Sequence, residues 1–121
     1  MKKYQSSNFF QSAKHASSGL YLAFRTQKNF RKHILIALFV LILAGILKAR
    51  PVEFAIIVAT NTCVLVAELI NSVIEFVMDA YYKNKYSTLC KFAKDMSAGA
   101  VLLCATSSAI IAAILLLPKI F

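Results

Sequence analysis

Long runs of apolar residues dominate the chain, and short polar segments separate them. Uncharged runs cover residues 34–47, 54–67 and 96–117. A helix needs about 20 mostly apolar residues to span a bilayer. The third run reaches that length, and lysines at the ends of the first run can extend it by reaching the interface. The apolar pattern of the second run continues past two glutamates to Met78. We therefore predict three transmembrane helices, over residues 33–49, 53–82 and 96–118.

An amphipathic pattern precedes the first span. Between residues 6 and 28, apolar residues recur at spacings of three and four, whereas most basic and hydroxyl side chains fall elsewhere on the helical wheel. We predict a helix over 6–28 that lies in the cytoplasmic membrane interface. A partly soluble helix packed on the bundle is the alternative. The whole chain, 1–121, is then a single all-α membrane domain.

Composition supports a membrane protein. Hydrophobic residues make up 60% of the chain and charged residues 16%, against roughly 25% charged in an average soluble domain. A soluble domain of this size could not bury so much apolar surface. The three cysteines are widely spaced and form no zinc or disulfide pattern. No signal peptide is expected, because the N-terminal residues lack an apolar core.

The distribution of charge predicts the orientation in the membrane. The first 33 residues carry seven Lys or Arg and no acid, and residues 80–94 carry four lysines and no acid. By the positive-inside tendency, we predict that the N-terminus and the 80–94 loop face the cytoplasm. The basic excess would attract anionic lipid headgroups and nucleotide phosphates. No nucleic-acid partner is expected.

Three of the five acidic residues lie close together in the second span, at Glu68, Glu75 and Asp79. Because each helical residue advances about 100°, these carboxylates share a stripe roughly 40° wide. Asn71 lies on its flank, and Asn61 extends it toward the membrane centre. An ionisable side chain in a membrane helix is costly, and it usually faces a partner or a cavity that serves function. Two structural alternatives remain: Glu68 could pair with a lysine or join helices, and Asp79 could simply be solvated.

A second polar cluster, Ala93 to Val101, opens the third span. Lys94 and Asp95 precede that span, where the free N–H groups and dipole of a helix N-terminus favour an anion. An interfacial anchor and helix cap is the alternative for this pair. The small residues from 97 to 100 would let another helix approach closely.

The two clusters together suit phosphoryl transfer. Carboxylates can hold Mg²⁺ and accept a proton from a hydroxyl, and lysine neutralises phosphate. The three glycines form no phosphate-binding loop.

These motifs resemble those of the small prokaryotic integral-membrane diacylglycerol kinases and their undecaprenol kinase relatives. The family pattern runs roughly E-x-x-N-[ST]-x-I-E-x-x-x-D, then a basic loop, then A-K-D-x-x-[AS]-[AG]-A-V-L. It reads here as Glu68 to Asp79 and Ala93 to Leu102. Upstream, Asn29 to His33 (NFRKH) is similar to the family's N-F-R-x-H. The likeness covers nearly the whole chain. It implies an ATP-dependent lipid kinase of the bacterial inner membrane, a homotrimer with active sites shared between subunits.

The resemblance also implies roles for individual residues. Glu68 looks like the general base on the lipid hydroxyl, and Glu75 looks like the Mg²⁺ ligand near the ATP phosphates. Asn71 would help to order the site. The implied nucleotide-binding residues are Glu75, Asn71, Tyr86, Lys94 and Asp95. The implied lipid-binding residues are Glu68, Ala98 and, along the path by which lipid reaches the site, Asn29, Phe30 and Arg31.

The chain departs from the family pattern at a few positions. The family usually has a glutamate, a second metal ligand, three positions before the phenylalanine of N-F-R, and here that position is Gln27. Asn8 and His15 stand where some members have an arginine and an aromatic residue. The loop between Asp79 and Lys94 is one residue longer than usual. Metal affinity and the nucleotide contacts of this loop are where we expect the chain to differ from the family.

The sequence therefore predicts transfer of the γ-phosphate of ATP to a membrane lipid alcohol. We predict 1,2-diacylglycerol as the acceptor, giving phosphatidic acid, with undecaprenol as the alternative. A small proton-coupled transporter is a further alternative, but it would want its acid near mid-membrane and usually a fourth span. A non-catalytic membrane adaptor would leave the costly acidic stripe unexplained.

Overall fold

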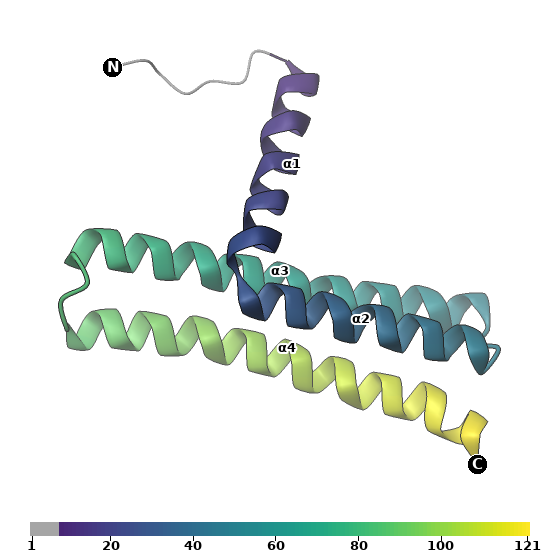
Figure 1. Ribbon diagram of the computed structural model, residues 1–121. Coiled ribbons are helices and arrows are strands. Elements are labelled where there is room, and N and C mark those ends of the chain that lie inside the picture. Colours follow the sequence, from purple (N-terminus) through teal and green to yellow (C-terminus); the bar gives the residue numbers. More distant parts are fainter. Residues whose placement is uncertain (1–7) are drawn as a thin grey trace.

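Figure 1 shows the computed structural model, which describes residues 8–121. This range contains four helices and no strand: α1 (Phe9–Thr26), α2 (Lys28–Ile46), α3 (Pro51–Tyr82) and α4 (Thr88–Ile120). The last three lie side by side as long rods, and α1 leaves them at a steep angle (Figure 1). Each of the three rods is long and apolar enough to cross a membrane. The predicted all-α fold, with three spans after an N-terminal helix, is confirmed.

Most helix ends differ from those that the hydropathy pattern predicts, although α3 ends at Tyr82 as predicted. Residues 6 and 7, the predicted start of the first helix, lie outside the described range. The first span begins at Lys28, five residues before the predicted start. The largest difference is α4, which begins at Thr88 instead of residue 96. Backbone hydrogen bonds continue along a helix whether its side chains face lipid or water, so the loop predicted over 80–94 shortens to residues 83–87.

A sharp break at Gln27 separates α1 from α2. Gln27 has an extended backbone, with φ −105° and ψ 104°. Arg31 Nη1 donates to the carbonyl oxygens of Phe24 and Arg25, at 2.8 and 2.9 Å. These bonds satisfy acceptors that the end of α1 would otherwise leave unpaired. The guanidinium of Arg31 therefore fixes the angle between the two helices.

The free sides of α1 fit a helix that lies on a membrane surface. Ala23 is its one buried residue, and Phe9, Phe10 and Leu20 are exposed. A helix with this much uncovered apolar surface is stable in a bilayer interface. The steep angle in Figure 1 places α1 across the direction of the three spans.

At the end of the bundle away from the α3–α4 loop, a buried glutamate joins α3 to α4. Pro51 occupies the first turn of α3, and the Glu53 carboxylate accepts from the backbone N–H of Arg50 at 2.9 Å. Lys119 Nζ lies 3.0 Å from the same carboxylate oxygen. Close by is the apolar core, formed by Ala44, Ile57 and Leu116.

The lengths of the helices show where the polar residues project. At 1.5 Å per residue, α2 is about 28 Å long, close to the hydrocarbon thickness of about 30 Å. The 32 and 33 residues of α3 and α4 extend about 48 and 50 Å. In Figure 1 the excess lies on the side of the α3–α4 loop, beyond the level at which α1 joins the bundle. The bundle thus extends beyond α1 on the side that carries Glu75 and Lys94.

Candidate active site

A row of buried polar side chains runs along α3 where it meets the other helices. Glu68, Asn71 and Ser72 are each at most 6% exposed. Ser97 of α4 donates its hydroxyl to Asn71 Oδ1 at 2.6 Å. The Ser72 hydroxyl lies 3.4 Å from Gln27 Oε1 at the α1–α2 break. The row, called the polar row below, therefore contacts α4 on one side and the α1–α2 junction on the other.

Glu68 supplies the carboxylate of the polar row. Its side chain is 5% exposed, and Oε2 lies 3.7 Å from His33 Nε2 on α2. A carboxylate this far from water needs polar neighbours, because removing a charge from water costs several kcal/mol. Phe30, one turn before His33, is buried. Glu68 thus lies where α2 begins its passage along α3.

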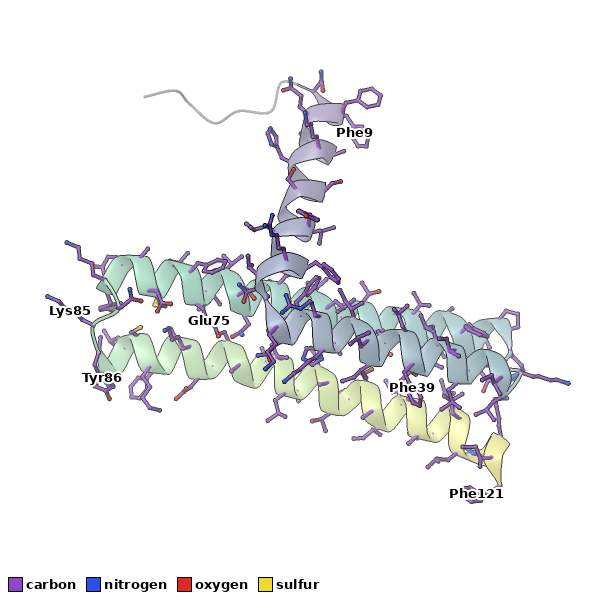
Figure 2. The ribbon with its side chains drawn as sticks, in the orientation of Figure 1. Phe9, Phe39, Glu75, Lys85, Tyr86 and Phe121 are labelled. Atoms are coloured by element: carbon purple, nitrogen blue, oxygen red, sulfur yellow. The ribbon has the colours of Figure 1, made fainter. Side chains whose placement is uncertain are left out.

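Glu75 lies seven residues beyond Glu68, roughly 10 Å farther along the helix axis. Asn71 Nδ2 donates to Glu75 Oε1 at 3.3 Å. Since Ser97 holds the other end of the Asn71 amide, the hydrogen bonds fix which way that amide points. Figure 2 shows Glu75 between the base of α1 and the α3–α4 loop. Glu75 is half-buried and remains open to a bound ligand.

Beyond Glu75, a cavity of about 590 Å³, called the loop cavity below, opens between the ends of α3 and α4. Its volume is within the range of small-molecule sites, about 300–1,000 Å³. Two ion pairs line it: Lys94 Nζ with Asp79 Oδ1, and Lys91 Nζ with Asp95 Oδ2, each at 2.5 Å. Figure 2 shows Lys85 and Tyr86 reaching outward at this end. The polar and aromatic lining residues are Asp79, Tyr82, Asn84, Lys85, Tyr86, Ser87, Lys91, Lys94 and Asp95.

The structure brings most of the predicted nucleotide residues to one end of the bundle. Tyr86, Lys94 and Asp95 all line the loop cavity, and Asn71 with Glu75 lies on the adjacent part of α3. The predicted setting of Lys94 and Asp95 at a helix N-terminus is wrong. Because α4 begins at Thr88, these two residues lie inside the helix, and the N–H groups that lack a partner within the helix belong to residues 88–90, since Lys91 N–H already donates to the Ser87 carbonyl oxygen.

The predicted lipid-binding residues have varied surroundings. Phe30 is buried, Asn29 and Ala98 are exposed, and Arg31 is half-buried against the end of α1. With Glu68 and Gln27, the residues from 29 to 31 surround the α1–α2 junction. Ala98 lies on α4, next to Ser97, which contacts the polar row.

Several polar residues of the site are absent from the sequence-based prediction. Lys85 and Lys91 line the loop cavity, Ser72 and Ser97 hold the polar row, and His33 lies against Glu68. The spacing of Ser72 four residues after Glu68 was a usable signal, since positions i and i+4 share a helix face. Nothing in the sequence alone pairs His33 with Glu68, because the contact joins two helices.

Known proteins have sequences similar to this chain. The family model described as prokaryotic diacylglycerol kinase matches residues 14–116. The chain belongs to the prokaryotic diacylglycerol kinase family. It is therefore related to lipid kinases, a class of transferases, and the polar row with the loop cavity is its candidate active site.

Three relatives within this family illustrate its range. A diacylglycerol kinase of Synechocystis sp. is 37% identical over 113 residues, which cover 93% of this chain and 65% of that protein. An undecaprenol kinase of Bacillus subtilis is 37% identical over 112 residues, covering 93% and 90%. A diacylglycerol kinase of Helicobacter pylori is 32% identical over 94 residues, covering 78% and 73%. The chain thus spans just under two thirds of the Synechocystis relative but most of the Bacillus one.

The donor set at Glu75 fits a magnesium ion that arrives with a nucleotide. Mg²⁺ is commonly bound by one or two carboxylates plus substrate phosphates and water, and not by an all-protein cage. Among residues 8–121, no three His, Cys, Asp or Glu side chains gather as a metal site. One carboxylate at Glu75, with the Gln27 amide at the nearby α1–α2 break, matches the first kind of site.

Proposed function

We propose that this chain transfers the γ-phosphate of ATP to the hydroxyl of 1,2-diacylglycerol, giving phosphatidic acid and ADP. One observation supports this proposal most directly. The Glu68 carboxylate is buried among apolar helices, and Glu75 and the basic loop cavity follow it along α3. In this proposal, the lipid hydroxyl approaches Glu68 from within the membrane, and the water-soluble nucleotide enters the loop cavity.

Glu68 would act as the general base. It accepts the proton of the lipid hydroxyl while the hydroxyl oxygen attacks the γ-phosphorus, a role that a positioned carboxylate performs well. Its burial favours this reaction over ATP hydrolysis, because few water molecules can compete with the lipid as nucleophile. The residues from 29 to 31 and Ala98 would border the lipid.

The loop cavity would hold the nucleotide. Lys94 offers a positive charge to the phosphates, and Tyr86 offers an aromatic face at the loop. Asp95 fixes Lys91 beside the same cavity. Glu75 would hold Mg²⁺, which neutralises the charge that develops on the phosphate oxygens. Asn71 keeps the Glu75 carboxylate oriented.

Transfer of labelled γ-phosphate to a panel of lipid alcohols in mixed micelles tests this proposal. Purified protein with ATP and Mg²⁺ should label diacylglycerol, and labelling should stop when Mg²⁺ is chelated. A panel with diacylglycerol, undecaprenol and a simple long-chain alcohol separates the acceptors. Absence of label in every lipid would reject a lipid kinase.

Undecaprenol is the second candidate acceptor. It is supported by the Bacillus subtilis relative, named undecaprenol kinase, of which this chain covers 90% at 37% identity. Preferential labelling of undecaprenol in the same panel would replace diacylglycerol as the substrate and leave the proposed chemistry unchanged.

We also propose that the protein works as a homotrimer in the bacterial inner membrane, with its N-terminus and the α3–α4 loop in the cytoplasm. Lys83 and Lys85 of this loop support the orientation, and ATP is available on that side. The family resemblance supports the trimer. Reaction of an engineered cysteine at Lys85 with a membrane-impermeant reagent should require broken cells, and mass measurement in detergent should give three chains.

A further inference from the structure

His33 lies beside Glu68, the proposed base, and the proposed reaction assigns it no role. Its Nε2 atom lies 3.7 Å from Glu68 Oε2, and its side chain is 22% exposed against 5% for Glu68. The two residues come from neighbouring helices, α2 and α3, and they meet where the polar row enters the apolar part of the bundle. The contact therefore joins the base to the helix that follows the α1–α2 junction.

His33 also lines an apolar cavity of about 250 Å³ that runs deeper between α2, α3 and α4. Two other polar side chains of this cavity, Asn61 and Ser108, contact each other and the backbone of α2. Ser108 Oγ lies 3.4 Å from Asn61 Oδ1, and Asn61 Nδ2 lies 3.4 Å from the carbonyl oxygen of Ala37. His33 is thus the polar side chain at the end of this cavity that faces Glu68.

We propose that His33 is a positioning residue that acts through Glu68. In the complex with lipid and ATP, its Nε2–H donates to Glu68 Oε2 and holds the other carboxylate oxygen toward the lipid hydroxyl. A separation of 3.7 Å is too long for a hydrogen bond, but contacts of catalytic groups are often long before substrate binds and shorten in the complex. A base that is itself oriented by a third group is a recurring arrangement in group transfer.

The chemical step stays balanced with His33 in this role. The lipid O–H bond breaks and its proton passes to Glu68, the lipid oxygen forms a bond to the γ-phosphorus, and the bond from that phosphorus to the bridging oxygen breaks. The electron pair of the broken bond leaves with ADP. His33 keeps its own proton on Nε2 and forms no bond to the substrate, so its effect should fall on the rate of this step.

Three substitutions at His33 test the geometry. Gln places its amide nitrogen near the position of Nε2, Asn places it nearer that of Nδ1, and Phe keeps the ring shape without a donor. In the lipid panel assay, His33→Phe and His33→Asn should lower kcat by at least about tenfold, with the KM for lipid and for ATP within about twofold of wild type. His33→Gln should stay within about threefold of wild-type kcat, because it restores the donor.

A double substitution shows whether His33 acts through Glu68. If it does, adding His33→Phe to Glu68→Gln should cause no further loss beyond about twofold. Unfolding midpoints in detergent show which variants remain folded. The comparison of Gln with Asn uses two polar amides, so it stands even if the Phe variant does not fold.

Specific results would overturn the inference, which depends on the proposed function. Wild-type kcat in His33→Phe, equal activity of the Asn and Gln variants, or a loss confined to the KM for lipid would each reject it. If wild-type protein itself labels no lipid, the proposed function fails, and this outcome is separate from the comparison among variants.

Discussion

Lys94 of α4 and Asp79 of α3 form an ion pair across the two helices that carry the loop cavity, with 2.5 Å between Nζ and Oδ1. Both side chains are partly exposed, at 36% and 42%, so the pair contributes little to stability. The ion pair instead fixes the position of a charge. Asp79 holds the Lys94 ammonium at the edge of the loop cavity, where a phosphate can replace or join the carboxylate.

We expect Lys94→Met to raise the KM for ATP by about tenfold, because a charge-assisted contact to phosphate is worth about 1.5–3 kcal/mol. The KM for lipid should not change, since Lys94 lies at the loop end, away from Glu68. Steady-state kinetics with each substrate varied in turn measures both.

Lys83→Asn is the matched control for this experiment. It removes one positive charge from the same end of the molecule at a residue that does not line the loop cavity. Lys83 has φ 51°, and asparagine tolerates this left-handed conformation. If the control raises the KM for ATP as much as Lys94→Met does, the effect comes from overall charge and not from a contact.

Glu68→Gln should reduce kcat by about 10²–10⁴-fold, the usual contribution of a general base. Glutamine keeps the shape and a polar oxygen, so the fold and binding of ATP should remain intact. Labelled phosphate transfer in mixed micelles measures turnover, and the unfolding midpoint in detergent checks the fold. Near-normal kcat would show that another group takes the proton.

The three spans followed from hydropathy, because lipid requires long apolar helices whatever their partners, and the N-terminal helix followed from its amphipathic spacing. Glu68, Glu75 and Asp79 were predicted to share one face, because their spacing is fixed by the helix itself. Contacts between helices could not be predicted from the sequence. Nothing in the spacing of His33, Ser97 or Lys119 states which α3 residue each one meets.

The start of α4 shows a second limit of the sequence. Hydropathy marks where a helix enters lipid, and residues 88–95 are too polar for lipid. They nevertheless continue the same helix, because the backbone hydrogen bonds do not depend on the solvent around the side chains. The prediction therefore placed Lys94 and Asp95 just before a helix, whereas both lie inside the N-terminal part of α4 and line the loop cavity.

The resemblance described above implies a metal-binding glutamate at the position of Gln27. Gln27 Oε1 lies 3.4 Å from the Ser72 hydroxyl, and Ser72 precedes Glu75 by about one turn on the same face of α3. A carboxylate at this position would add a negative charge beside the proposed magnesium ligand. We expect Gln27→Glu to lower the Mg²⁺ concentration needed for half-maximal activity several-fold. Electron paramagnetic resonance with Mn²⁺ as a probe should show tighter binding in the presence of ATP.

Gln27→Met is the paired variant, because it has nearly the same length but no amide oxygen. It should require more Mg²⁺ than wild type. Equal Mg²⁺ dependence in all three proteins would mean that residue 27 lies outside the metal site, and that Glu75 and the phosphates hold the ion without it.

Lys119→Met should destabilise the protein without affecting catalysis. Lys119 Nζ lies 3.0 Å from the Glu53 carboxylate, which is 7% exposed, at the end of the bundle opposite the loop cavity. Losing this partner leaves the Glu53 charge with only Arg50 nearby, so the folded state should be less stable than in wild type. Thermal unfolding in detergent should show a lower midpoint, whereas kcat and both KM values at low temperature should match wild type. Adding Glu53→Gln to Lys119→Met removes the charge itself and should recover part of the lost stability. An unchanged midpoint in the single variant would show that Arg50 alone satisfies Glu53.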